Sequence, residues 1–277
     1  MDKVKRNERL AVITKTLCSN PSKLFTLSYF CSVLGANKSS LSEDISALKT
    51  VFEQRGLGRM ETMPGAMGGV RFIPSIPKEK VFAYAQELAT MLSDSRRALA
   101  GGYIYMTDVL SDPQQLENMA QCLAAPYFNK NIDHVITIET KGIPIALMCA
   151  RVLGVPLIIA RRENRINEGS IVSINYITGS GRRMETMSLP RRAIDNGQRV
   201  LIVDDFMRAG GSVKGLCDLM REFNVTVEGV AVLVATKQPE RKLVEGYRSL
   251  LTLYSVDDYQ GIIDIRPSTV LSDNRQM

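Results

Sequence analysis

Two adjacent acidic residues and a glycine-containing loop form the stretch of this sequence with the most distinct chemistry. Asp204 and Asp205 follow the apolar residues 200–203, and residues 209–212, Ala-Gly-Gly-Ser, come after three intervening residues. Carboxylates at the end of a strand can accept hydrogen bonds from the vicinal hydroxyls of a ribose. Successive N–H groups at a helix start bind phosphate, and we expect Ser212 to cap that helix and to donate to the phosphate. Residues 200–212 therefore predict a site for a phosphorylated sugar, with an ordinary strand-to-helix turn as the alternative.

A second loop with phosphate-binding chemistry precedes a predicted helix at residues 143–153. It consists of Glu139, Thr140, Lys141 and Gly142. A lysine ammonium and successive loop amides can hold a pyrophosphate, with Mg2+ shared between the phosphate oxygens. We therefore expect the two loops to bind the two charged ends of one ligand.

Alternating strand and helix patterns predict the scaffold that positions these loops. We expect strands at residues 134–138, 156–160, 199–203 and 229–235, with helices at residues 113–128, 143–153 and 213–223. An amphipathic helix at residues 81–92 and a chain break at 101–103 precede them. Nearly continuous apolar strands that alternate with helices indicate an α/β fold with a parallel sheet, in which ligands bind beyond the carboxyl ends of the strands.

The first 74 residues have a different pattern and a different charge. They contain 11 Lys+Arg against 6 Asp+Glu, whereas the remaining 203 residues contain 24 against 23. Helical spacing over residues 10–17, 27–34 and 40–52, with a turn at Gly35, predicts a helix-turn-helix arrangement. We expect Ser40 to cap the third helix in a capping box with Glu43. Two short strands around a Pro- and Gly-rich turn within residues 58–74 complete a winged helix.

The polar face of the third helix and the arginines of the wing are the predicted DNA contacts. The side chains concerned are Lys38, Ser39, Ser40, Ser42, Ser46, Lys49, Arg59 and Arg71. Small polar side chains on the helix would meet base edges, and the wing arginines would lie against phosphates. A plain three-helix core with a solvated face is one alternative, and a protein-docking module is another. We predict a winged helix-turn-helix domain over residues 1–74 and a second domain over residues 75–277.

Composition excludes several classes of protein. No apolar run is long enough to span a bilayer, and no secretory leader pattern opens the chain. The five cysteines have no CxxC spacing, which indicates reduced thiols in a cytoplasmic protein rather than a disulfide scaffold or zinc site. His134, the only histidine, lies among apolar residues and is predicted to be a packed strand residue. We expect no catalytic residue and no resident metal.

Residues 200–212, VLIVDDFMRAGGS, resemble the phosphoribosyl diphosphate (PRPP) motif of the type I phosphoribosyltransferases. Ala209 departs from that motif, because a hydroxyl residue is common there, and one phosphate contact is lost. Over residues 3–265 the chain resembles the purine operon repressors of Gram-positive bacteria. The stretches that carry this resemblance include SSLSED, PGAMGGVRFIP, GGYIYMTD, ETKGIP and EGSIVSINYITGSGRRMETMSLP.

The resemblance implies a homodimeric repressor that binds operator DNA and senses PRPP, with Mg2+, as an inducer rather than consuming it. The effector site it implies consists of Thr140, Lys141, Gly142, Asp204, Asp205, Phe206, Arg208, Ala209, Gly210, Gly211 and Ser212, with Tyr103 beside Phe206. A base would stack at these two rings, so a guanine nucleotide such as ppGpp is a candidate corepressor at the same site. An active purine phosphoribosyltransferase with an appended DNA-binding domain is the alternative function.

The arginine-rich residues 161–192 have two interpretations that the sequence leaves open. Two alternating strands are predicted there, at residues 171–176 and 184–189. In the transferases this segment closes over the pyrophosphate, so it can serve the ligand, or it can provide a second basic surface for DNA. A solvated charged hairpin remains the simplest explanation for any single arginine.

Overall fold

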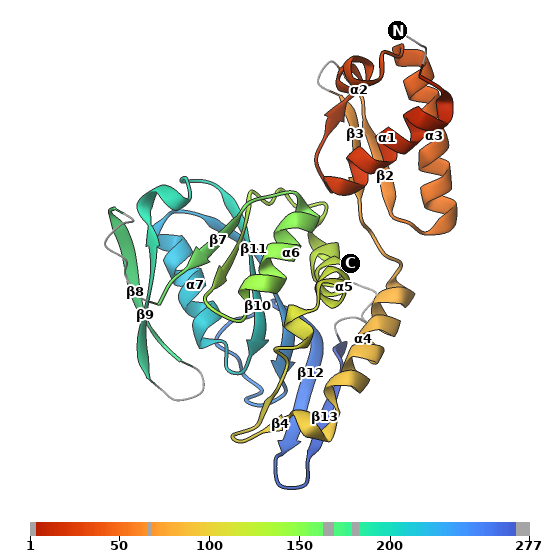
Figure 1. Ribbon diagram of the computed structural model, residues 1–277. Helices are drawn as coiled ribbons and strands as arrows, with labels where there is room; N and C mark the ends of the chain where they lie inside the picture. The colour runs from red at the N-terminus through yellow and green to blue at the C-terminus, as the bar shows by residue number, and fades with distance from the viewer. Residues whose placement is uncertain (1–3, 66–67, 163–168, 179–182, 270–277) are drawn as a thin grey trace. The chain divides into compact units, whose positions relative to one another are not determined.

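A computed structural model describes residues 4–65, 68–162, 169–178 and 183–269 of the chain (Figure 1). It divides into two compact units, one of Met1–Pro77 with Arg151–Gly154 and one of Lys78–Ala150 with Val155–Met277. Each unit has its own cluster of buried apolar side chains. Within the described ranges, no helix is both long and apolar enough to cross a membrane.

The first unit is a winged helix, as the sequence predicts. Its helices and strands are α1 (Arg6–Ser19), β1 (Phe25–Thr26), α2 (Leu27–Leu34), α3 (Lys38–Arg55), β2 (Arg59–Met63) and β3 (Gly69–Ile73). The three strands form an antiparallel sheet in the order β1-β3-β2, and β2 and β3 are the wing. Ala66 and Met67, in the predicted wing turn, lie outside the described residues. Gly35 ends α2 in the left-handed conformation that glycine adopts without steric cost.

The start of α3 differs from the prediction. The helix begins at Lys38, and its cap is Asn37, whose side-chain oxygen accepts the backbone N–H of Ser40 at 2.9 Å. The predicted capping box of Ser40 with Glu43 is therefore wrong, because an asparagine three positions earlier takes that role. The apolar stripe is confirmed, and its buried members are Leu41, Ile45, Leu48 and Phe52.

The second unit is an α/β domain built on a six-stranded sheet in the order β13-β12-β11-β10-β6-β7. The sheet is parallel except at β13, which pairs antiparallel with β12. Its strands are β6 (His134–Ile138), β7 (Leu157–Ala160), β10 (Arg199–Met207), β11 (Thr226–Thr236), β12 (Arg248–Asp257) and β13 (Ile262–Pro267). Its helices are α4 (Lys78–Leu92), α5 (Pro113–Ala124), α6 (Ile143–Leu153) and α7 (Gly211–Glu222). Two hairpins flank the sheet, β4 (Ala98–Leu99) with β5 (Tyr103–Ile104) and β8 (Ile171–Ile177) with β9 (Met184–Pro190).

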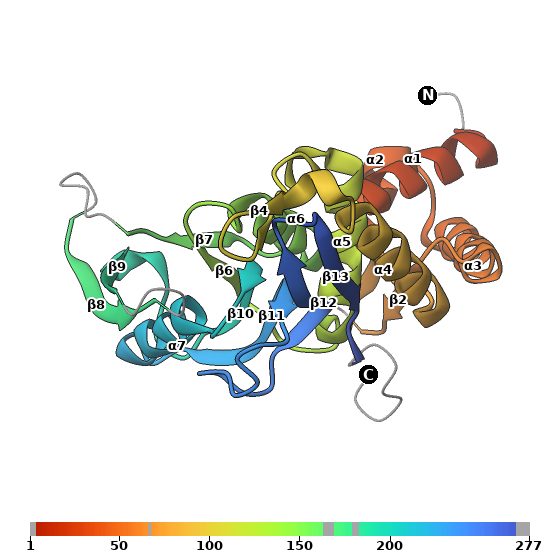
Figure 2. The same cartoon turned by 90° about the horizontal axis from the view of Figure 1, so that it is seen from below.

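The helices that follow β6 and β10 lie on opposite faces of the sheet. The apolar cluster on one face joins alternate residues of β6 and β10, such as Ile136 and Ile202, to α7 and the β8–β9 hairpin, while α5 and α6 lie over the other face (Figure 2). β6 and β10 are neighbours, and the chain leaves β6 through α6 and β10 through α7. A crevice therefore opens between the carboxyl ends of β6 and β10, where open α/β sheets bind ligands.

The limits of two predicted elements need correction, and two strands were not predicted. β10 continues to Met207, so Asp204 and Asp205 lie inside the strand rather than after it. The helix predicted at 113–128 ends at Ala124 and continues as a single 3-10 turn, Ala125–Tyr127. No strand was predicted after β11, yet β12 and β13 complete the sheet.

Candidate functional site

Two adjoining cavities open at the carboxyl ends of β6 and β10. One, of about 450 Å3, is bordered by residues 208–212, which we call the phosphate loop. The other, of about 500 Å3, is bordered by residues 139–142, which we call the lysine loop. The two cavities share Arg162, Asp204, Phe206 and Ser212. All twelve residues predicted for the effector site line one cavity or the other, so the structure brings the predicted set together.

The acid pair lies at the boundary between the cavities. Asp204 and Asp205 are only 7% and 8% exposed, and Oδ1 of Asp204 accepts the backbone N–H of Asp205 at 2.9 Å. Burial, followed by the charge of Asp205, raises the pKa of Asp204 well above its ordinary value. Burial also raises the pKa of Asp205, against a lowering by its hydrogen bond with Asp204 and the charge of Lys141. Two carboxylates held in this way at the cavity wall are acceptors for hydroxyl groups and attract cations.

Gly142 allows the lysine loop to approach the acid pair. A Cβ atom on this residue would lie 2.7 Å from Oδ1 of Asp204 and 2.7 Å from Oγ1 of Thr137. Both distances are shorter than van der Waals contact permits. The glycine therefore lets the backbone of the lysine loop lie close to the Asp204 carboxylate.

The phosphate loop leads into α7 with its first amides uncapped. Gly210 is the N-cap, in a left-handed conformation with φ of 85°, and no side chain caps the helix. The expectation that Ser212 caps α7 is therefore wrong. Ser212 instead lies in the first turn of α7 and lines both cavities. The uncapped N–H groups at the positive end of the helix leave donors for an anion.

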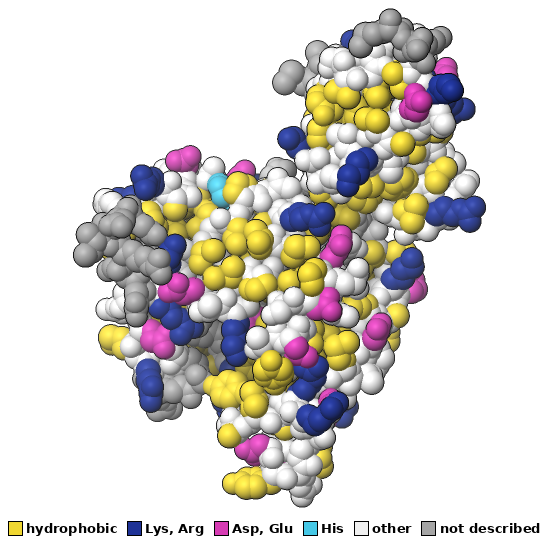
Figure 3. Space-filling view, viewed as in Figure 1, with side chains coloured by type: hydrophobic (Ala, Val, Ile, Leu, Met, Phe, Trp, Pro, Cys, Tyr) yellow, Lys and Arg dark blue, Asp and Glu magenta, His cyan; other side chains and the backbone are white. Residues whose placement is uncertain are grey.

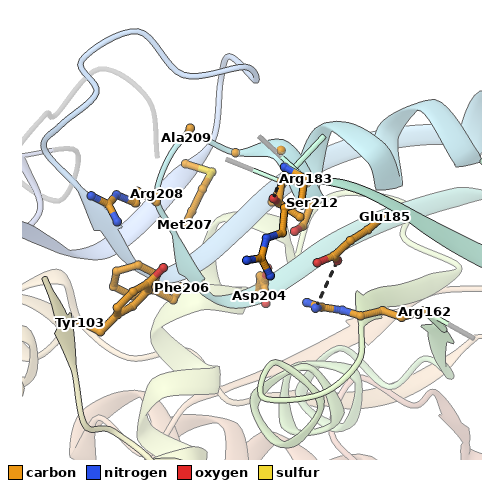
Figure 4. Close-up of a pocket in the computed structure, with 14 residues that line it drawn as sticks. Tyr103, Arg162, Arg183, Glu185, Asp204, Phe206, Met207, Arg208, Ala209 and Ser212 are labelled. Atoms are coloured by element: carbon orange, nitrogen blue, oxygen red, sulfur yellow. Dashed lines mark hydrogen bonds and ion pairs between the residues drawn. The ribbon is translucent and has the colours of Figure 1, made fainter. Parts of the chain in front are cut away.

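Two aromatic rings close one end of the cavity at the phosphate loop (Figure 4). The Tyr103 and Phe206 ring centroids are 6.1 Å apart, and the Arg208 guanidinium lies 5.9 Å from the Tyr103 centroid. Tyr103 comes from the β4–β5 hairpin, which Arg97 braces through hydrogen bonds to Asp108 and to the Tyr105 carbonyl. The two ring planes are tilted by 45° to one another, so they offer aromatic faces beside a cation, against which a base can pack.

The opposite end of that cavity holds an ion pair that the sequence did not assign to the site (Figure 4). Nη1 of Arg162 lies 3.3 Å from Oε2 of Glu185, and the Tyr176 hydroxyl donates to the same Glu185 oxygen at 2.6 Å. Arg183 also lines the cavity. The only sequence signal for these residues is the arginine enrichment of residues 161–192. Arg165 and Arg182 of that segment lie outside the described residues.

The first unit has a separate groove between α3 and the wing. It has a volume of about 490 Å3, and the predicted DNA contacts Lys38, Ser42, Ser46 and Lys49 line its α3 side. Residues 62–65 and 68–70 of the wing line the other side. Lysine and arginine side chains are spread over the face of this unit seen in Figure 3. The groove combines small hydroxyls with cations, the combination that suits contact with base edges and phosphates.

The other four predicted DNA contacts have local partners. Arg59 and Arg71 each form an ion pair with Glu61, at 2.6 and 2.7 Å, so both wing arginines are held by a carboxylate of the wing itself. The Ser39 hydroxyl donates to the Asn37 side chain at 3.0 Å, and the Ser40 backbone donates to the same oxygen. These four residues support the local structure of the winged helix.

Comparison with known proteins matches both units to described families. Residues 5–74 match the family model described as "Bacterial purine repressor, N-terminal", and residues 112–266 match "Phosphoribosyl transferase domain". The chain is 41% identical to the purine biosynthesis transcriptional repressor PurR of Bacillus subtilis, over 97% of this chain and 94% of that protein. The chain belongs to the PurR family. A second PurR, the purine biosynthesis transcriptional activator of Lactococcus lactis strain IL1403, is 40% identical over 98% of this chain and 100% of its own length.

The PurR fold of the second unit also matches solved phosphoribosyltransferases. The adenine phosphoribosyltransferase of Thermoanaerobacter pseudethanolicus superposes with a TM-score of 0.51 at 22% identity, covering 60% of this chain and 96% of that enzyme. At this identity the match supports the fold alone. The PurR family relationship makes this chain a transcriptional regulator of purine biosynthesis with a repressor-type DNA-binding domain.

Proposed function

We propose that this protein represses purine biosynthesis and salvage genes and is released from its operator by PRPP. The observation that supports the effector most directly is the pair of adjoining cavities. They gather an uncapped helix start, a buried acid pair and a lysine loop within reach of one ligand. PRPP carries a phosphate, two vicinal hydroxyls and a pyrophosphate, so each part of the site has a chemical counterpart in it.

The proposed pose follows from these counterparts. The 5-phosphate accepts hydrogen bonds from the amides of the phosphate loop, and the ribose hydroxyls donate hydrogen bonds to Asp204 and Asp205. The pyrophosphate, with Mg2+ between its oxygens, lies at Thr140 and Lys141. Arg162, which borders both cavities, offers a further cation to the diphosphate.

The effector acts on DNA binding through a two-state equilibrium in this proposal. A ligand shifts such an equilibrium only by binding one state more tightly than the other. PRPP would order the two loops and favour a homodimer in which the winged helices no longer fit the operator. The cytoplasm, which holds both PRPP and the chromosome, is the proposed location.

A guanine nucleotide such as ppGpp would act as a corepressor at the same site. Its phosphates would bind to the phosphate loop, and its base would lie at Tyr103 and Phe206, whose ring centroids are 6.1 Å apart. Because PRPP and ppGpp would share the phosphate loop, each should displace the other. Simultaneous binding of both at one site would rule this out.

We further propose that the site senses PRPP without catalysis. Ala209 stands where a hydroxyl is common in the transferases, which removes one contact to the phosphate. The intact cavity keeps an active purine phosphoribosyltransferase as the second candidate function. Incubation with PRPP, Mg2+ and each purine base separates the two, because an enzyme must release pyrophosphate over many turnovers.

The central experiment is fluorescence anisotropy of the protein on a DNA fragment from its own purine biosynthesis promoter, with PRPP and Mg2+ added to the complex. We expect tight binding that PRPP reverses. Relatives include both a repressor and an activator, so a promoter fusion in cells with and without the protein tests the sign of regulation. Binding that ignores PRPP would overturn the effector assignment, and lower expression in the absence of the protein would overturn repression.

A further inference from the structure

The loop between β11 and β12 holds the phosphate loop from outside the cavity. Nζ of Lys242 donates to the Arg208 carbonyl at 2.5 Å and to Oγ1 of Thr236 at 3.1 Å. The backbone N–H of the next residue, Leu243, donates to the Ala209 carbonyl at 2.9 Å. Lys242 borders neither cavity, so it contacts the phosphate loop without lying in the ligand space.

These two hydrogen bonds determine where the amides of the phosphate loop point. In a planar trans peptide the carbonyl and the following N–H point in opposite directions, and both peptides are trans here. Because the Arg208 and Ala209 carbonyls face the 242–243 segment, the N–H groups of Ala209 and Gly210 point away from it. Both residues line the cavity at the phosphate loop, so these N–H groups are the ones available to an anion there.

We propose that Lys242 is a positioning residue for effector binding, which by holding the Arg208 carbonyl keeps the amides of the phosphate loop turned toward the ligand's phosphate. This inference rests on the proposed function, since it takes PRPP as the ligand. Lys242 would act through the loop backbone and not by touching the phosphate.

The charges around Lys242 add a pH signature to this role. Burial, followed by the charges of Arg208 at the end of β10 and Lys237 after β11, lowers the pKa of Lys242 to about 8. Glu240 and Arg241 of the same loop are exposed to solvent. A bound phosphate dianion favours the ammonium form, so effector binding should raise this pKa and take up protons near pH 8. For the same reason, affinity should fall as the pH rises through 8.

The test compares PRPP-Mg2+ binding to the full-length wild type, Lys242→Met, Lys242→Arg and Arg241→Met by isothermal titration calorimetry at pH 7.5, 8 and 9.5. Methionine keeps the apolar stem and removes the donor, arginine keeps a donor that stays charged, and Arg241→Met removes one exposed charge from the same loop. Phosphate monoesters are fully ionised throughout this pH range because their second pKa is about 6.

We expect Lys242→Met to bind PRPP about tenfold more weakly at pH 7.5, the loss typical of a hydrogen bond to a charged donor. Lys242→Arg should restore most of the affinity, and Arg241→Met should match the wild type. Wild-type affinity should fall several-fold between pH 7.5 and 9.5, whereas the affinities of both Lys242 variants should not. Runs in two buffers of different ionisation enthalpy should show proton uptake at pH 8 by the wild type alone.

The outcomes separate this inference from the proposed function. Equal affinity and equal pH profiles for wild type and Lys242→Met would overturn the role of Lys242 and leave PRPP as the effector. A wild type that binds neither PRPP nor ribose 5-phosphate would overturn both. Operator binding without PRPP should be unchanged in every variant. If Lys242→Met fails to fold, the pH profiles and proton uptake of wild type and Lys242→Arg decide the question.

Discussion

Gly142 and Asp204 lie so close together that a methyl group on the glycine would be 2.7 Å from the carboxylate Oδ1. The same methyl would be 2.7 Å from the Thr137 hydroxyl, and Thr137 and Asp204 are both buried. We expect Gly142→Ala to push the lysine loop away from the acid pair, lowering PRPP affinity at least tenfold. Overpacking of this kind costs about 1–3 kcal/mol of unfolding free energy. Calorimetric PRPP binding and urea unfolding measure the two effects.

Operator binding is the internal control for Gly142→Ala. The winged helix has its own apolar cluster, so the variant should bind DNA normally and fail to release it with PRPP. A variant that binds PRPP like the wild type would contradict the close approach of the two loops.

Asp204 should destabilise the fold at neutral pH in exchange for ligand binding. Burial and the charge of Asp205 raise its pKa above the ordinary value of 3.8, so the native state binds this proton more tightly than the unfolded chain does. Stability therefore falls as the pH rises through the window between the two pKa values. Asp204→Asn keeps an oxygen acceptor for the Asp205 amide, and we expect it to be more stable than wild type at pH 7 by about 1 kcal/mol or more.

Urea unfolding at pH 7, 5.5 and 4 checks this prediction, because the advantage of Asp204→Asn should shrink as the pH falls. The same variant should bind operator but not respond to PRPP. An advantage that stays constant with pH would mean that the carboxylate has no raised pKa, and a full PRPP response would mean that it does not bind the ribose.

The sequence predicted the parts of this structure whose signals are local. β6 and α6 have the predicted limits because each is a continuous apolar segment between polar loops, and the acid pair and phosphate loop are contiguous in the chain. β12 and β13 were missed because they lie at one side of the sheet, where burial is mixed and the apolar pattern is weak. Asn37 was missed as a cap because Ser40 with Glu43 offered a competing local motif.

Two of the site contacts that were missed are made between distant positions. Arg162 meets Glu185 across 23 residues, and Lys242 meets Arg208 across 34. Such pairs form only when the hairpin and the β11–β12 loop pack against α7 and β10, and no spacing rule in the sequence encodes that packing. The arginine content of residues 161–192 indicated polyanion contact but not which arginine makes it.

Lys49 and Arg71 should differ in their effects on DNA binding. Lys49 lines the groove between α3 and the wing, whereas Arg71 is held by Glu61 at 2.7 Å. We expect Lys49→Ala to weaken operator binding about tenfold and to reduce the slope of log affinity against log salt by about one. Arg71→Ala should have a smaller effect, mainly by loosening the wing.

Anisotropy titrations between roughly 50 and 200 mM salt measure both variants, because affinity that depends on phosphate contacts falls steeply over this range. PRPP binding is the control and should be unchanged in each. A larger loss with Arg71→Ala than with Lys49→Ala would show that Arg71 leaves Glu61 for a phosphate in the complex.

Glu185 should weaken effector binding in the wild type. Its Oε2 lies 3.3 Å from Nη1 of Arg162 and accepts from the Tyr176 hydroxyl at 2.6 Å, at the edge of the cavity proposed for an anion. Glu185→Gln removes a negative charge that repels PRPP and occupies Arg162, and it leaves an acceptor for Tyr176. We expect PRPP affinity to rise about threefold, the size of effect typical of a partly exposed ion pair. Glu245 is exposed elsewhere on the chain, so Glu245→Gln should leave the affinity unchanged and serves as the control.

Arg162→Gln should lower PRPP affinity about tenfold. If Glu185→Gln binds PRPP more weakly in calorimetry, the carboxylate is part of the binding site, most simply through Mg2+, and does not compete with the ligand.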